Sequence, residues 1–421
     1  MKKRLIEFVA LVLEFWLVIW TYERFASSIP FFQNPASTFY DGIVVSLVAS
    51  FLFLALTGFN HILSFLFDKG SSALWSFYIK TSDIRSHLDE TIAKAYKFLM
   101  SAKIKWGPTL RNSTRKIANV AEGLLAVLHY EQTKSIAGSD KKERDKVLKK
   151  LIAEQKEEGY ESYNLGKYTT HCTAMTLFAV KQYHDLSIYQ LEPDQSAGFR
   201  KAAEHLLSSS NSLGWGTYNE VVDDEKLIRL LSTFWALRAL NVWGFSGDTK
   251  YVEILSSLLN RVPDGEFGFC LDSQHKTSII SLFLILIKEL KDEHTRNLIS
   301  EKLKEKDIKK LLGLLIKDLN TSIEIEEYLL ESSGKHNKLS WTHFSFFLSV
   351  SALSQYANLL SRFSYLKLVL KVSAVLKTQF HKDGYYSNEK LNSVEGNPFT
   401  YPTAYAIIGL SDFRRSLDQF E

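Results

Sequence analysis

The chain has 421 residues, 46% of them hydrophobic, and its acids and bases nearly balance to a net charge of +4. That balance excludes the basic surface of a nucleic-acid-binding protein. The only two cysteines, Cys172 and Cys270, exclude a disulfide framework. The length allows one large domain with an appendage.

Two apolar stretches open the chain. The first, at 5–22, is interrupted by Glu7 and Glu14 and as a helix would span about 27 Å. The second, at 42–67, carries no charge unless His61 is protonated, and it is long enough to cross a bilayer with some tilt. We therefore predict a two-helix transmembrane hairpin within residues 1–70, followed by a linker at 71–81.

Basic residues flank this hairpin on both sides, whereas the loop at 23–41 contains only Arg24. The flanking bases are Lys2, Lys3, Arg4, Lys69, Lys80 and Arg85. The positive-inside rule then predicts a two-pass membrane protein with both termini in the cytoplasm. The alternative for the first stretch is a signal peptide with a cleavage site near 26–28.

Glu14 lies near the middle of the first predicted span. An ionisable group at that depth costs roughly 2.5–3.5 kcal/mol on insertion scales, so it should face a partner helix or water rather than lipid. One interpretation is an oligomeric or pore-lining contact. The other is a protonated glutamic acid that is hydrogen-bonded within the hairpin, for example to Ser46 or Ser50.

A repeat of about 50–60 residues fills the chain from residue 82 to residue 421. In each copy a glycine turn, usually next to an aromatic residue, precedes an apolar helix rich in small residues. The turns lie at 106–107, 159–160, 214–216, 265–269, 333–334 and 384–386, and the apolar helices begin near 112, 169, 227, 276, 340 and 398.

Amphipathic helices are predicted between the apolar ones, at 83–100, 141–156, 195–209, 248–262, 305–319 and 361–379. A helix that is apolar on all sides is surrounded by protein, whereas an amphipathic helix has one face in water. The alternation predicts an all-α domain of two concentric rings around a central cavity. An open solenoid of helix pairs is the alternative.

These repeats resemble those of terpenoid cyclases and protein prenyltransferase β subunits, which share glycine–aromatic turns followed by apolar helices rich in Ser, Thr and Ala. The resemblance covers residues 82–421 and implies an (α/α)6 toroid. It also implies a polyisoprenoid substrate in the central cavity, with the reactive groups near the starts of the inner helices.

The resemblance directs attention to two motifs. Some cyclases protonate their substrate with an Asp-x-Asp-Asp motif, and the nearest match here is 221–224, which retains Asp223 and Asp224 but begins with Val221. The alternative is that both aspartates cap a helix. The prenyltransferases bind zinc through Asp-x-Cys and a later His.

The pair that matches this zinc motif is reversed here, as Cys270-Leu271-Asp272. With His343 from the next repeat, Cys270 and Asp272 form a candidate zinc set with an open position. The alternative is a buried thiol and a capping carboxylate.

Helix N-termini that converge on a cavity concentrate donors and positive potential, so we expect an anionic head group with an apolar tail to bind there. The predicted ligand residues are His171, Arg229, His275, Trp341, His343, Tyr401 and Tyr405.

Two classes of function follow. The first is a membrane-anchored toroid that binds a ligand or partner, including an effector that perturbs membranes as in prokaryotic defence systems. The second is an enzyme that acts on an isoprenoid or another lipid. The incomplete motifs favour the first. The predicted partners are the lipid bilayer, an isoprenoid or anionic amphiphile, and a protein or a second copy bound through the hairpin, but no nucleic acid.

Overall fold

A computed structural model describes residues 84–101, 106, 117–160, 168–222, 224–267, 270, 272–290, 292–319, 324–332, 335–343, 345–386 and 400–419. The chain separates into two compact units, Met1–Thr81 and Ser82–Glu421, and the described residues all belong to the second. The predicted transmembrane hairpin and Glu14 lie outside them. Among the helices that are described, none combines the length and the apolar character needed to cross a membrane.

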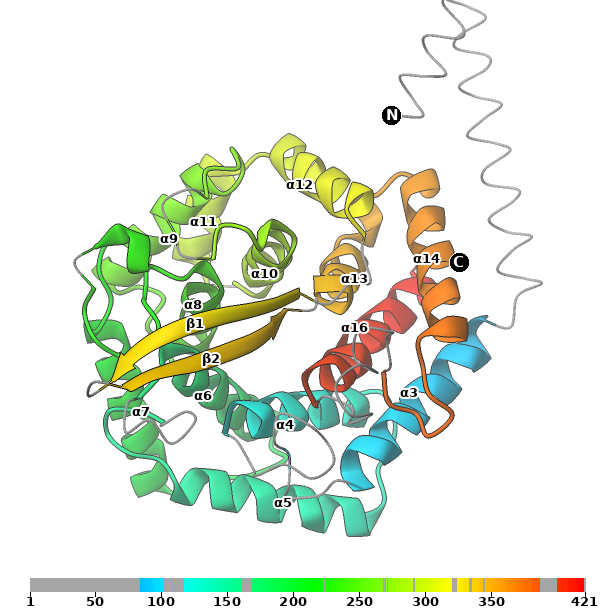
Figure 1. Cartoon of the computed structure of the whole chain (residues 1–421), viewed down its shortest axis with the longest axis horizontal. Coiled ribbons are helices and arrows are strands. Elements are labelled where there is room, and N and C mark those ends of the chain that lie inside the picture. Colours follow the sequence, from blue (N-terminus) through cyan, green and yellow to red (C-terminus); the bar gives the residue numbers. More distant parts are fainter. Residues whose placement is uncertain are drawn as a thin grey trace, which may run out of the picture. The chain divides into compact units, whose positions relative to one another are not determined.

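Helices dominate the second unit and alternate between two concentric rings (Figure 1). The outer ring contains α3 (Ile84–Ser101), α5 (Gly138–Ala153), α7 (Pro193–Ser208), α9 (Thr249–Arg261), α12 (Glu305–Lys317) and α14 (Arg362–Thr378). The inner ring contains α4 (Ile117–Glu131), α6 (Thr170–Asp185), α8 (Leu230–Val242), α10 (Lys276–Glu289), α13 (Ser345–Gln355) and α16 (Thr400–Asp418). An additional helix, α11 (Glu293–Lys302), packs against α9. The predicted alternation of helices is confirmed.

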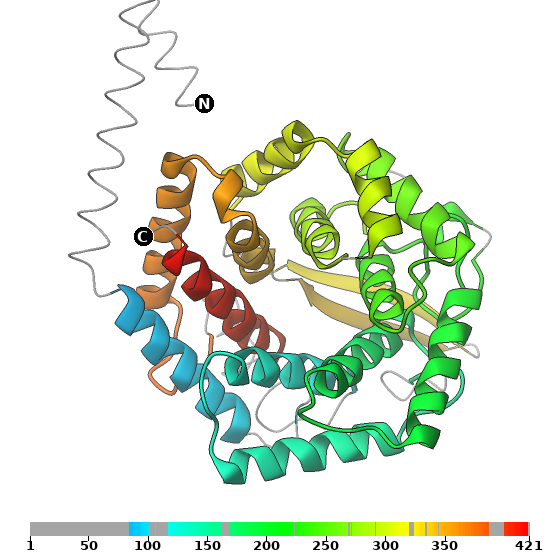
Figure 2. The same cartoon turned by 180° about the vertical axis from the view of Figure 1, so that it is seen from behind.

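The inner ring is closed. Each inner helix packs against the next one in the chain, and the last, α16, packs against the first, α4. The view from behind shows the same closed order (Figure 2). Closure excludes the open solenoid for these residues.

Burial explains the difference between the two rings. In α4 every residue from Ala118 to Leu128 is buried, as expected for a helix without a polar face. In the outer helix α9 the buried residues recur at spacings of one, three and four and so form a single stripe; they are Tyr251, Ile254, Leu255, Leu258 and Leu259.

In two repeats the glycine–aromatic turn connects an outer helix to the inner helix that follows it. In the third repeat the N–H of Trp215 donates to the Thr233 hydroxyl at 3.1 Å, and its indole Nε1 donates to the Leu206 carbonyl at 2.6 Å. Gly214 has a φ of +140°, and a Cβ there would lie 2.4 Å from the Thr233 hydroxyl oxygen, so glycine is required. The same two bonds recur one repeat earlier, at Tyr160, Thr173 and Leu151.

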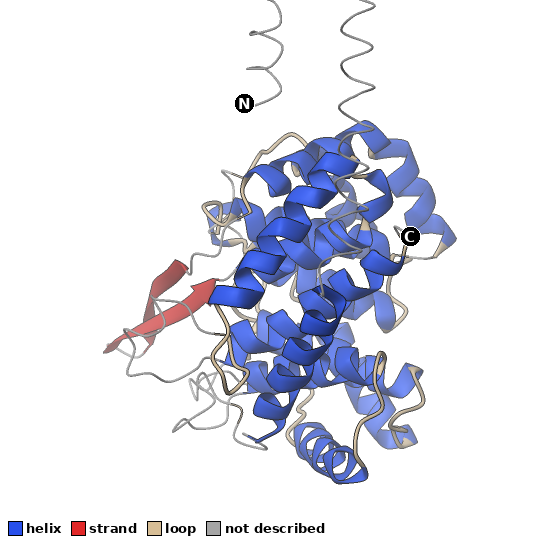
Figure 3. Cartoon of the chain, turned by 90° about the vertical axis from the view of Figure 1, so that its right-hand side faces the viewer, coloured by secondary structure: helices blue, strands red, loops and turns tan. Residues whose placement is uncertain are grey.

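The prediction of helix alone is wrong at 324–343. There β1 (Glu324–Ser332) and β2 (Lys335–His343) form an antiparallel hairpin in which Glu324 pairs with His343. It lies across one face of the double ring (Figures 1 and 3). The helix expected from residue 340 begins at Ser345, because the residues before it, Trp341 to His343, favour a strand more than a helix. Trp341 and His343 are therefore strand residues and do not start an inner helix.

Candidate functional site

Side chains from inner helices that are not neighbours in the ring meet at its axis. The charges of Arg238 on α8 and Glu289 on α10 act on His129 on α4. Tyr405 on α16 is within electrostatic reach of Glu122 on α4 and of Arg238. Since α8 and α10 lie across the ring from α4 and α16 (Figure 1), these interactions cross the axis.

The axial side chains form two layers. On α4 and α16 an axial residue recurs after seven positions, at Glu122 and His129 and at Tyr405 and Asp412, which keeps one helix face and advances about 10 Å. We define the upper axial layer as residues from the first half of the inner helices, namely Asn119, Glu122, His171, Trp235, Tyr401 and Tyr405. The lower axial layer is defined by residues from the second half of these helices, namely His129, Phe178, Arg238, Glu289, Ser351 and Asp412.

The upper axial layer contains a buried carboxyl, Glu122, that has no counter-charge among the residues the structure describes. Glu122 is 4% exposed and Asn119 is 8% exposed, and the amide Nδ2 of Asn119 donates to Oε2 of Glu122 at 2.9 Å. Burial raises the pKa of Glu122 to about 8, against the opposing effect of this hydrogen bond. Glu122 is therefore protonated at neutral pH and presents an acidic O–H.

Aromatic residues of the inner helices share the upper axial layer with this carboxyl, and Tyr405 is within its electrostatic reach. The rings of Tyr401 and Tyr405 lie 4.5 Å apart, and the ring of His171 meets Trp235 edge-on at 6.3 Å. Tyr405 and Trp235 are buried, whereas Tyr401 and His171, near the helix starts, are half-buried. The layer thus offers flat apolar surfaces and one polar pair.

The lower axial layer pairs its charges. The guanidinium of Arg238 donates from Nε and Nη2 to the two carboxylate oxygens of Glu289, each at 2.7 Å. It also lies over the rings of Trp235 and Phe178, at 4.1 and 4.4 Å from their centroids. Such a bidentate, stacked arginine holds its neighbours in one arrangement.

Asp412 is the second centre of the lower axial layer. Its carboxylate, 5% exposed, accepts hydrogen bonds from Ser351 and Arg415. Nδ1 of His129 lies 3.7 Å from the same carboxylate. Burial lowers the pKa of His129 despite that carboxylate, so the imidazole is neutral at neutral pH.

Three of the predicted ligand residues belong to the upper axial layer, namely His171, Tyr401 and Tyr405. Arg229 and His275 are instead buried at the N-caps of α8 and α10. The position of a residue at the start of an apolar helix therefore predicted some members of the upper axial layer but not all of them.

Asp224 is the one aspartate of the candidate acid motif that the structure describes, and it does not belong to the axial layers. Asp224 is exposed and caps the short 3-10 helix Glu225–Leu227, where its carboxylate accepts from the Lys226 N–H at 2.9 Å. Asp223 lies outside the described residues. The capping alternative is thus correct for Asp224.

In the Cys-x-Asp pair, Asp272 caps the start of the preceding inner helix, α8. The two carboxylate oxygens of Asp272, which is fully buried, accept from the N–H groups of Leu230 and Leu231, each at 2.9 Å, at the start of α8. Burial and the neighbouring Asp272 raise the pKa of the Cys270 thiol, whose Sγ donates to the Phe267 carbonyl. In the described part of the chain no group of three or more His, Cys, Asp or Glu side chains could hold a metal ion. His343 lies on β2, and Asp272 acts as a cap.

Glu122 is the functional candidate that sequence reasoning missed. It is the one ionisable residue in the apolar run 117–128 of the first inner helix. An isolated acid in a helix that is apolar on all sides was the available signal.

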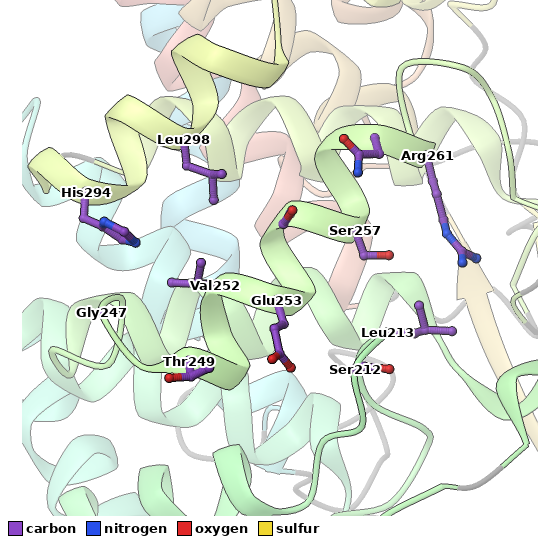
Figure 4. A pocket seen from close by; sticks show the side chains of 12 residues that line it. Ser212, Leu213, Gly247, Thr249, Val252, Glu253, Ser257, Arg261, His294 and Leu298 are labelled. Atoms are coloured by element: carbon purple, nitrogen blue, oxygen red, sulfur yellow. The ribbon is translucent and has the colours of Figure 1, made fainter.

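A separate open groove of about 770 Å³ lies on the outer ring between α9 and α11 (Figure 4). Glu253, Ser257 and Arg261 from α9 and His294 and Leu298 from α11 line it. Glu253 and His294 in its lining are exposed to solvent, and none of its lining residues belongs to the axial layers.

Comparison with models of known protein families and with curated proteins gives no match to this chain. The upper axial layer is therefore the basis for assigning a function.

Proposed function

We propose that residues 82–421 form an (α/α)6 toroid that binds a small amphiphilic molecule at the upper axial layer. The observation that carries this proposal is the Glu122–Asn119 pair buried on the axis. The fold has no need of it, because an apolar residue in α4 would pack there without the free-energy cost of burying an acid. A ligand that forms hydrogen bonds with this pair would explain why an acid is buried at this position.

The neighbouring side chains support an apolar body for the ligand. Trp235, Tyr401 and Tyr405 supply large flat surfaces, which are typical of sites where a few polar groups orient an otherwise apolar molecule. The partial exposure of His171 and Tyr401 favours entry from the inner-helix starts.

Native mass spectrometry of the full chain in detergent tests the proposal. We expect wild-type protein to carry a copurified small molecule and the Glu122→Leu variant to lose it while staying folded. Glu253→Leu, on the exposed face of α9, is the control and should keep it. Wild-type protein without any bound molecule, or equal occupancy in Glu122→Leu, would contradict the proposal.

A second candidate is acid catalysis on an isoprenoid or other lipid. The raised pKa of Glu122 favours it, because a general acid has to be protonated at working pH, and aromatic faces stabilise positive charge. Glu122→Gln keeps a donor but no transferable proton. For an enzyme this variant should retain the ligand and stop its conversion, and for a binding protein it should leave function intact.

We further propose that residues 1–67 anchor the toroid in the membrane with both termini in the cytoplasm, as the apolar spans and flanking bases favour. Single cysteines at 25–38 should then react with an impermeant reagent added outside cells, and a C-terminal one should not. The opposite labelling pattern would overturn the topology. If the hairpin acts as a membrane effector or oligomer contact, Glu14→Leu should abolish the cellular effect and leave the toroid folded.

A further inference from the structure

The upper axial layer contains an acceptor that has no partner. Oδ1 of Asn119 is buried, and no hydrogen bond reaches it within the described residues. The other end of the same amide is occupied by Oε2 of Glu122 at 2.9 Å. A buried acceptor left unpaired costs about 1–3 kcal/mol, which a bound O–H or N–H would recover.

Glu122 supplies a hydrogen-bond donor next to the unpaired acceptor of Asn119. Protonated at neutral pH, its carboxyl keeps an O–H donor. A single ligand group that both donates to Asn119 Oδ1 and accepts from the Glu122 O–H would complete the pair. If the Asn119 amide turns over, it presents a donor instead of an acceptor, and a group with both capacities still fits.

The charges nearby disfavour an anion. Among the described residues, burial and the Asn119 hydrogen bond determine the pKa of Glu122, and no cation contributes. Arg238, whose charge reaches Tyr405, is already engaged by Glu289 through both oxygens. An anionic head group would therefore be buried unpaired, at a large free-energy cost.

We infer that the head group recognised at the Glu122–Asn119 pair is a neutral hydroxyl, and that the ligand is an apolar alcohol. This inference rests on the proposed binding function and replaces the expected anionic head group with an uncharged one. The rings of Tyr401, Tyr405 and Trp235 contact the apolar body of such a molecule.

Three probes of equal chain length test the inference, namely hexadecanol, hexadecanoate and hexadecyl phosphate. Quenching of tryptophan fluorescence in the full chain in detergent at neutral pH reports their binding. We expect hexadecanol to bind at least about tenfold more tightly than either anion, which corresponds to about 1.4 kcal/mol.

Variants locate the site. Glu122→Leu and Asn119→Leu should each weaken hexadecanol binding about tenfold, whereas Glu122→Gln, which still donates, should stay within about threefold of wild type. Glu253→Gln, in the outer groove, is the matched control and should bind as wild type does.

The outcomes separate the two claims. Tighter binding of hexadecanoate or the phosphate would overturn the hydroxyl inference and leave the binding function standing. An equal loss of affinity for all three probes in Glu122→Leu would also overturn the hydroxyl inference, because Glu122 would then not discriminate between head groups. Failure of all three probes, together with a wild-type protein that copurifies with nothing, would overturn the proposed function itself.

Discussion

The upper and lower axial layers differ in whether their ionisable side chains have oppositely charged partners, although both layers use the same faces of α4 and α16. In the lower layer Arg238 is paired with Glu289, and Asp412 is paired with Arg415. In the upper layer Glu122 has an amide neighbour and, in the part of the chain that the structure describes, no cation. Paired charges can be explained by the fold, because they fix helices relative to one another. A neutralised acid cannot be explained in that way, and so the upper layer is the better place to look for function.

The largest expected effect concerns Glu122. Its pKa is about 8 in the folded protein against an ordinary value of 4.5, so the folded state holds a proton that the unfolded chain releases between these values. Stability therefore falls as the pH rises from about 4.5 to about 8, by roughly 3–5 kcal/mol in total. Glu122→Gln should lack this fall, so its melting temperature should exceed that of wild type by a margin that grows with pH.

Thermal unfolding in detergent across that pH range measures the effect. Glu253→Gln, an exposed acid on α9, should follow wild type at every pH. Parallel curves for Glu122→Gln and wild type would mean that the carboxyl is charged in the folded protein, and the contrast between the layers would disappear.

Removing the Arg238–Glu289 ion pair of the lower layer should lower the free energy of unfolding by a smaller amount. Arg238→Met keeps much of the apolar volume but leaves Glu289 without its partner and removes the cation from two aromatic faces. Because Glu289 is 31% exposed, we expect a loss of about 2–4 kcal/mol in the free energy of unfolding. Chemical denaturation of the variant would reveal it. Arg200→Met, whose partner Glu204 is also exposed, should change it by less than about 0.5 kcal/mol.

Asp272 extends the comparison to a buried acid whose two carboxylate oxygens both accept hydrogen bonds from backbone N–H groups. Asp272→Asn offers only one acceptor to the two N–H groups of Leu230 and Leu231, so it should cost about 1–3 kcal/mol. A chelator should leave the melting temperature of wild type unchanged. If the chelator lowers it and the variant is insensitive, Asp272 is a metal ligand after all.

Asp224 gives the smallest effect. Asn caps a helix about as well as Asp, and the residue is exposed, so Asp224→Asn should alter stability by less than about 0.5 kcal/mol and leave ligand binding unchanged. A folded variant that has lost function would restore the acid-motif interpretation of this segment.

The helices of the second unit could largely be predicted from sequence, because hydrophobic periodicity separates a helix with one apolar face from a helix buried on all sides. The spacing of glycine–aromatic turns was equally informative, since Trp215 and Tyr160 make the same bonds in successive repeats. The hairpin at 324–343 was missed, because a glycine turn before an apolar run has the same appearance whether a strand or a helix follows.

Predicting the site was harder. His171 and Tyr405 could be placed near the axis from their positions on apolar helices. The role of Asp272 could not, because its carboxylate caps α8, a helix about forty residues earlier in the chain. Glu122 was passed over because no motif contains it, and only its burial in the closed ring reveals an acid that has no counter-charge among the described residues.

The closure of the ring by its last helix also constrains how the protein is made. α16 packs against α3, α4 and α13, and Arg414 near its end reaches Asp89 on α3. On the ribosome, α3 and α4 emerge long before this partner, so the apolar flank of α4 stays open until α16 has emerged. Contacts between distant parts of a chain also form slowly. Nascent chains that stop before Thr400 should therefore be protease-sensitive and bound by chaperones, and the ring should close only after α16 has left the ribosome.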